Sequence, residues 1–89
     1  MDHRTMIREF IIDNFLFGER ERAPKDEDSF LELGIIDSTG ILELVGFLEE
    51  KFRFSVKDDE LVPENLDSVD NVVRYIEKKR NEGPMHAGA

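Results

Sequence analysis

An aspartate followed by a serine, Asp37-Ser38, stands where a loop gives way to an amphipathic helix in this chain of 89 residues. Asp and Ser are favoured at helix starts, because their side-chain oxygens accept from backbone N–H groups that the first turn leaves unpaired. Those amides and the helix dipole also favour negative charge. A phosphate ester on the Ser38 hydroxyl would therefore be stabilised there, within reach of a partner enzyme. The competing interpretation is that Ser38 only caps the helix.

Other chemistries fit the sequence less well. A serine nucleophile needs a base within hydrogen-bond reach, and the histidines, His3 and His86, stand near the ends of the chain. A nucleophile elbow, Gly-x-Ser-x-Gly, would require glycine where Ile36 stands. The sequence has no cysteine, which excludes disulfides, thiolate metal sites and a cysteine nucleophile. The acidic run 26–28 lacks the turn glycine of an EF-hand. We interpret it as a solvated charge run and predict neither a catalytic residue nor a metal site.

The composition favours an interaction surface over an enzyme pocket. The chain has 12 Lys and Arg against 21 Asp and Glu, a formal net charge of −9. Nucleic acids and anionic membranes recruit basic patches, so neither is an expected partner. The acidic surface suits a protein with a basic docking face, although solubility alone would also explain it. No apolar run approaches membrane-spanning length and the N-terminal stretch lacks an apolar signal core, so we expect a cytoplasmic location. We also expect a monomer.

Apolar periodicity predicts an all-α domain, a small four-helix bundle of three main helices and a short one. The main helices are expected over about 5–17, 38–52 and from a cap at Asp67 or Ser68 onward. A long packed loop fills 19–37, and a poorly regular helix fills 58–66, where Pro63 disfavours helix in the residue before it. We place the domain at 1–81 and expect a disordered tail at 82–89. Phe17 is assigned to the first apolar stripe, and Tyr75 to the flank of the last one with its hydroxyl outward.

The start of the second helix resembles a known family. Asp37-Ser38 and the residues that follow are similar to the Asp-Ser-Leu motif and second helix of acyl carrier proteins; the matching positions are Leu42, Glu43, Leu44, Val45, Leu48, Glu49, Glu50 and Phe52. The likeness covers nearly the whole chain, from about Ile7 to Lys79. It implies that Ser38 carries 4′-phosphopantetheine, whose thiol holds an acyl or aminoacyl group as a thioester. The chain would then be a carrier, not an enzyme.

The resemblance also implies which enzymes bind this chain and where. The expected partners are a phosphopantetheinyl transferase, an adenylating acyl or aminoacyl ligase, and a downstream acyltransferase or synthase. The expected contact residues follow the serine and its helix: Thr39, Leu42, Glu43, Gly46, Glu49, Glu50 and Val56. Gly40 and Gly46 each cost up to about 1 kcal/mol relative to alanine within a helix. They would either let a partner or the prosthetic arm approach the backbone or be tolerated packing choices, and the sequence leaves both explanations open.

The spacing before the serine indicates the kind of carrier. Two residues separate Gly34 from Asp37 and Gly40 follows shortly after, a pattern that resembles D-alanyl carrier proteins and related stand-alone carriers. Thr39 departs from both that pattern and the fatty-acid pattern, so the partner is not fixed. Bulky side chains could fill an acyl cavity, which favours a small or aminoacyl cargo; they are Phe10, Phe15, Phe30, Phe47, Phe52 and Phe54. The rival function is an unmodified acidic helical adaptor that binds a basic protein.

Overall fold

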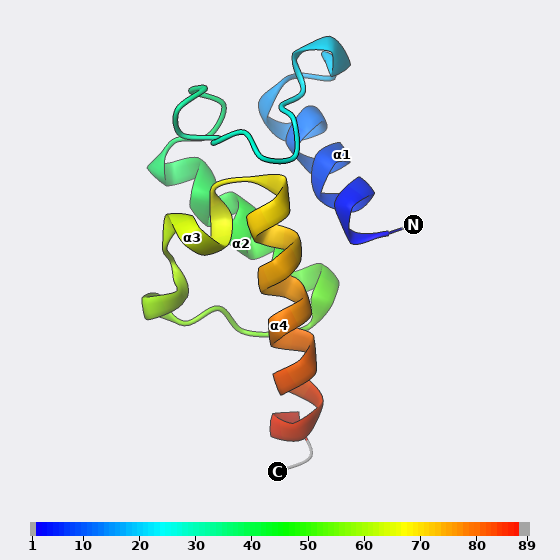
Figure 1. The fold of residues 1–89 in the computed structure, drawn as a ribbon, viewed down its shortest axis with the longest axis vertical. Helices are drawn as coiled ribbons and strands as arrows, with labels where there is room; N and C mark the ends of the chain where they lie inside the picture. Colours follow the sequence, from blue (N-terminus) through cyan, green and yellow to red (C-terminus); the bar gives the residue numbers. More distant parts are fainter. Residues whose placement is uncertain (1, 88–89) are drawn as a thin grey trace.

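Four α-helices and two short 3₁₀ turns make up the protein in a computed structural model, which describes residues 2–87, side chains of residues 82–87 excepted. The helices are α1 (His3–Phe15), α2 (Ser38–Phe52), α3 (Pro63–Leu66) and α4 (Val69–Ala87), with 3₁₀ turns at Arg20–Arg22 and Asp58–Glu60. The described residues contain no β-strand. The predicted all-α bundle, with a long loop between the first two helices, is confirmed (Figure 1).

Helix α1 begins and ends earlier than the sequence predicts. The Asp2 carboxylate accepts from Thr5 N at 2.7 Å and starts the helix. After Phe15 the backbone turns, and Gly18, with φ 85°, closes the helix by donating to Ile12 O at 2.9 Å. The assignment of Phe17 to the buried stripe is wrong: its φ is 54° and its side chain is 86% exposed. Leu16, four residues after Ile12, takes the buried position instead.

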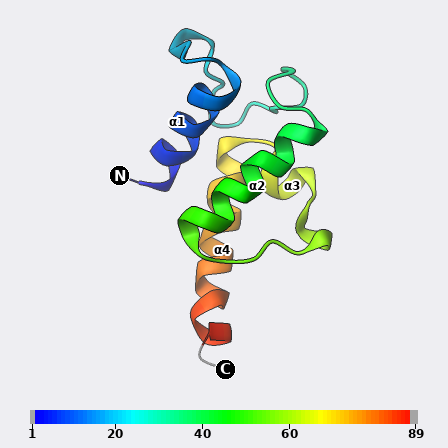
Figure 2. The ribbon, with the colours of Figure 1, turned by 180° about the vertical axis from the view of Figure 1, so that it is seen from behind.

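The core lies where α4 packs against the other three helices (Figures 1 and 2). Two side chains from the long loop, Phe30 and Ile36, are as deeply buried as the helical residues. The loop is therefore a packed part of the fold, as predicted. The largest fully buried side chains come from all of these segments: Ile7, Ile11, Leu16, Phe30, Ile36, Leu44, Leu48, Leu66, Val69, Val72 and Ile76.

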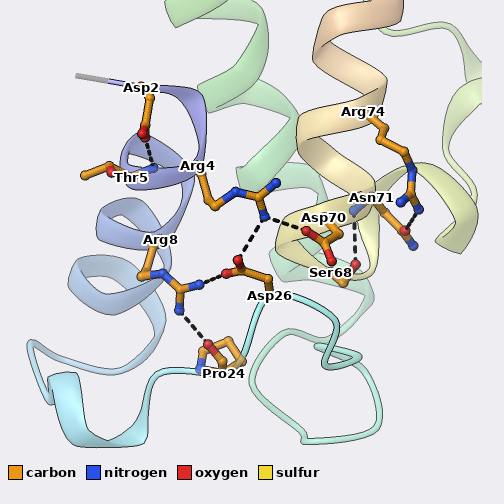
Figure 3. Close-up of polar contacts among 10 residues, drawn as sticks. All are labelled: Asp2, Arg4, Thr5, Arg8, Pro24, Asp26, Ser68, Asp70, Asn71 and Arg74. Atoms are coloured by element: carbon orange, nitrogen blue, oxygen red, sulfur yellow. Dashed lines mark hydrogen bonds and ion pairs between the residues drawn. The ribbon is translucent and has the colours of Figure 1, made fainter.

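A charged cluster fastens the loop to the bundle (Figure 3). Arg4 donates to Asp26 at 3.0 Å and to Asp70 at 2.5 Å. Arg8 pairs with Asp26 as well and donates to Pro24 O at 2.6 Å. The backbone adds a bond from Asp70 N to Asp26 O. Asp26 is therefore not part of a solvated run, because two arginines from α1 meet it once the loop crosses the helices.

The segment predicted as one irregular helix over 58–66 forms a 3₁₀ turn at Asp58–Glu60 and the separate short helix α3, whereas α4 begins after the predicted cap. Pro63 occupies the first position of α3, where its missing N–H costs nothing. Ser68 caps α4, since its hydroxyl accepts from Asn71 N at 3.1 Å. The prediction for Tyr75 is wrong: the side chain is 3% exposed, and its hydroxyl donates to Glu60 Oε1 at 3.1 Å. The carboxylate that turns it inward comes from the segment before α3.

The backbone of α4 continues to Ala87, through most of the predicted tail. This stretch contains Gly83 and Pro84, which are unfavourable in a helix interior, and the disordered tail from Glu82 stays a prediction. These last turns project past the other helices in both views (Figures 1 and 2). A domain boundary near Asn81 stays a prediction, and residues 88 and 89 of the predicted tail lie outside the described residues.

Candidate functional site

The side chain that caps α2 belongs to Asp37, not to Ser38. Asp37 has an extended backbone, and its Oδ1 accepts from Gly40 N at 2.8 Å. Ser38 is the first residue of α2 and is exposed. Among the described residues its hydroxyl has no hydrogen-bond partner. The interpretation of Ser38 as only a cap therefore fails, because the neighbouring carboxylate does that work and leaves the hydroxyl available for chemistry.

Close packing below the serine fixes its position. Ile36, two residues before it, is 2% exposed, and Gly34 turns the loop with φ 71°. A Cβ at position 40 would lie 2.9 Å from both Ile36 Cγ2 and Phe15 Cε1. Gly40 therefore lets the end of α1 and the loop close in on the first turn of α2. The open question about this glycine is settled in favour of packing.

An open cleft of about 280 Å³ lies beside Ser38, where the loop and α2 face the segment leading into α3. Its lining is mainly aliphatic: Leu31, Ile41, Leu42, Leu61, Val62, Pro63 and Leu66, with Ser38 and Asp67 as the polar members. The Asp67 carboxylate accepts from the Ser29 hydroxyl and from Leu31 N, which holds the loop at one side of the cleft. An apolar group attached at Ser38 would therefore find an apolar surface next to its point of attachment.

The phenylalanines do not fill this cleft. Phe10 stacks on Phe47 with ring centroids 4.1 Å apart and meets Phe15 edge-on at 5.8 Å, so these rings pack between α1 and α2. None of the cleft-lining residues is a phenylalanine. The cleft itself is not predicted from the sequence. Its one sequence signal is the group of apolar residues in the irregular stretch 61–66, which belongs to no helical stripe.

The predicted contact residues divide into two groups. Thr39, Leu42, Glu43, Gly46 and Glu50 are exposed, and Leu42 is 60% exposed despite being apolar. A Cβ at Gly46 would meet nothing within 4 Å, so internal packing does not require this glycine.

The second group is Glu49 and Val56, which are half-buried and joined to each other. The Glu49 carboxylate accepts from Val56 N at 2.9 Å. Glu49 is thus engaged inside the molecule and fixes Val56 after the end of α2.

No histidine lies beside the serine among the side chains that the structure describes. His3 packs edge-on against Phe52, at the opposite end of α2, with centroids 5.0 Å apart. In the part of the chain that the structure describes, no group of three or more metal-ligating side chains is present. Within that part, too, no helix is long and apolar enough to cross a bilayer.

Several curated proteins match most of this sequence. The acyl carrier protein of Chlamydia trachomatis serovar D is 33% identical over 75 residues, which cover 84% of this chain and 92% of that one. The chain belongs to the acyl carrier protein family. A D-alanyl carrier protein of Streptococcus uberis is 36% identical over 77 residues, covering 84% of this chain and 96% of its own. The resemblance seen in the sequence is thereby confirmed.

A solved member of the family shares the fold. The solution NMR structure of a holo acyl carrier protein from Nitrosomonas europaea superposes with a TM-score of 0.73 at 27% identity, covering 91% of this chain and 99% of that one. No protein-family model matches the sequence. This chain is about equally identical to the acyl carrier protein and to the D-alanyl carrier protein. These matches therefore do not choose between the two kinds of carrier.

Proposed function

We propose that this chain carries 4′-phosphopantetheine on Ser38 and moves an acyl or aminoacyl group between enzymes as a thioester. The observation that carries the proposal is the exposed Ser38 hydroxyl, unbonded because Asp37 caps the helix. Family membership supports it, and the relatives are carriers by name. The chain serves as a substrate of its partner enzymes and not as a catalyst.

The residues at the start of α2 fit such a group. A transferase would join Ser38 Oγ to the phosphorus of the pantetheine phosphate of coenzyme A. The diphosphate bond would break, with 3′,5′-ADP as the leaving group and the serine proton passing to the transferase. The first turn of α2, whose dipole favours negative charge, would stabilise the phosphate on Ser38. The group supplies the thiol that this cysteine-free chain lacks.

The cleft beside Ser38 favours a short cargo. Its volume of about 280 Å³ lies just below the roughly 300–1,000 Å³ typical of small-molecule pockets. Aliphatic walls from Leu61, Val62 and Leu66 would shelter an apolar arm or a short acyl chain. A small acyl or aminoacyl group is therefore the cargo that we propose, and an adenylating ligase is the enzyme that would load it.

The exposed face of α2 is the proposed contact surface for the transferase, the ligase and a downstream acyltransferase or synthase. Glu43 and Glu50, about two turns apart on the same side of the helix, present carboxylates beside the exposed Leu42 and the bare backbone of Gly46. Basic side chains of a partner would pair with these acids and steer its approach. Glu49 and Val56 support this surface from within. A cytoplasmic monomer is the expected working form.

The deciding experiment is attachment of the group. The purified protein is incubated with coenzyme A, Mg²⁺ and a broad-specificity phosphopantetheinyl transferase, and its intact mass is measured. We expect a gain of one phosphopantetheine that Ser38→Ala abolishes and the matched control Ser55→Ala, at another exposed serine, retains. An unchanged mass in the parent protein would refute the proposal and favour the acidic adaptor.

A second experiment tests the contact surface. Glu43→Lys combined with Glu50→Lys should slow attachment markedly while the melting temperature changes little, because both side chains are exposed. Glu77→Lys combined with Glu64→Lys, exposed acids outside α2, is the charge-matched control. Equal slowing in both double variants would mean that net charge matters and the α2 face does not.

A further inference from the structure

Glu60 ties three segments of the protein together. Its Oε1 accepts from Lys57 N at 2.9 Å, from the Tyr75 hydroxyl at 3.1 Å and from Lys79 Nζ at 3.0 Å. Lys79 Nζ also donates to Oε2 at 3.2 Å. The Glu60 backbone carbonyl accepts from Asn65 Nδ2 at 2.9 Å, in α3. One residue thus links α4, the connection after α2, and α3.

The ion pair is shielded from water. The side chains of Lys79 and Glu60 are 11% and 20% exposed. The Phe54 ring lies 5.9 Å from Lys79 Nζ and meets the Tyr75 ring edge-on at 5.8 Å, so aromatic carbon covers one side. Burial alone would raise the pKa of Glu60, but hydrogen bonds from Lys57 N, Lys79 and Tyr75 outweigh it and lower the pKa. The carboxylate is therefore charged at neutral pH.

Residues that directly follow Glu60 form a wall of the Ser38 cleft. Leu61, Val62 and Pro63 line the cleft, and Leu66 completes that wall. Val62 precedes α3 without a side-chain cap, and α3 is only four residues long. A helix this short has no stability of its own, so its place depends on contacts from outside. Glu60 supplies such contacts on both its side chain and its backbone.

We propose that Glu60, held by Lys79 and Tyr75, is the positioning residue that sets the width of the cleft beside Ser38. Glu60, Tyr75 and Lys79 are not among the residues that line the cleft, so the contact acts without touching the cargo. Loss of the ion pair frees Leu61 and Val62 to move outward, and the cleft then gives a group on Ser38 less shelter. The role of the cleft as a shelter rests on the proposed function; the hold of Glu60 on the wall does not.

The first test uses the unmodified protein and amide hydrogen exchange. Glu60→Gln and Lys79→Met should speed exchange at the amides of Leu61, Leu66 and their neighbours by roughly tenfold or more, since one charge of a shielded pair is left unpartnered. The amides of Leu44 and Leu48 in α2 should keep their protection. The matched controls, Glu64→Gln and Lys78→Met, change exposed side chains one turn or one residue away. Faster exchange throughout the protein would overturn the proposal, because it would show a general stabilising role.

The second test uses protein that carries phosphopantetheine on Ser38, with an octanoyl or an acetyl group on the thiol of that arm. Thioester hydrolysis, followed by intact mass, should accelerate in Glu60→Gln for the octanoyl form and stay unchanged for the acetyl form, whose single methyl group buries little apolar surface against Leu61 and Leu66. Equal rates for parent and variant with both groups would overturn the positioning role. Failure of loading itself would refute the carrier function, while the exchange result would still decide what Glu60 holds.

Discussion

The two ends of α2 use their polar groups in opposite ways. At the start, Asp37 satisfies the helix and leaves the Ser38 hydroxyl unbonded and exposed. At the finish, Glu49 accepts from Val56 N, and Arg53 ends the helix in a left-handed conformation with φ 61°. The connection beyond it is then fixed by Glu60 and Lys79. At the end proposed for chemistry a reactive hydroxyl stays free, whereas at the other end the side chains form contacts that hold the backbone in place.

The largest stability effect is expected at the start of α2. Gly40→Ala places a methyl group 2.9 Å from Ile36 and Phe15, both held by the core. Overpacking of this kind costs about 1–3 kcal/mol, more than the ~1 kcal/mol that alanine contributes to a helix interior. A urea titration should show the midpoint falling. A midpoint at or above that of the parent protein would mean that the first turn is packed less tightly than the distances indicate.

The next largest effect is expected beyond the other end of α2, where the contribution of Glu60 to stability should depend on pH. The folded pKa of Glu60 lies below its ordinary value of 4.5, so the stability it contributes is present above pH 4.5 and is lost as the pH falls through the folded value. Thermal melts of the parent protein and Glu60→Gln should therefore differ at pH 7 and converge in acid. The control Glu64→Gln should follow the parent curve throughout. A difference that persists undiminished in acid would contradict an ionic contribution.

A smaller loss is expected where α2 meets Val56. Glu49→Ala removes the acceptor for Val56 N. A buried N–H left without an acceptor costs about 1–3 kcal/mol, and this half-buried one should cost less. Glu50→Ala, its exposed neighbour, should stay within about 0.5 kcal/mol of the parent. Urea unfolding of both variants measures the difference. Equal losses would place Glu49 on the outer surface with Glu50.

The smallest effect should be a gain. Gly46→Ala meets nothing within 4 Å, so the helix propensity of alanine should raise stability by up to about 1 kcal/mol. The rate at which the transferase attaches phosphopantetheine to this variant tests whether a partner contacts the backbone at Gly46. A slower rate in this more stable variant would indicate that a partner approaches the helix at position 46. An unchanged rate would leave Gly46 without a part in that contact.

Much of this arrangement was predictable from the sequence. The bounds of α2 and the packed loop follow from strong apolar periodicity and from the helix-entry residues Asp37 and Ser38. Phe17 and Tyr75 were assigned wrongly because their environments depend on a chain turn and on a distant carboxylate. Asp26 was assigned to solvent for the same kind of reason, since its partners Arg4 and Arg8 stand far from it in the sequence.

The candidate site divides in a similar way. Ser38 and the exposed face of α2 lie within one continuous segment, so a motif could reveal them. The cleft is built from the loop, α2 and the approach to α3, which only folding brings together. The ion pair between Glu60 and Lys79 joins residues 19 positions apart, so no local sequence pattern indicates it. Sequence patterns thus indicated where the chemistry takes place and could not indicate what shapes the space around it.

The charged cluster around Asp26 has a kinetic consequence. Arg4 bonds to residues 22 and 66 positions away in the chain, so these bonds close two large loops at once. Closing such loops is entropically costly, which delays contacts of this kind until the helices have already collapsed. Arg4→Met should therefore leave the refolding rate nearly unchanged and accelerate unfolding. The contacts of this cluster would form late in folding and would slow the unfolding of the protein.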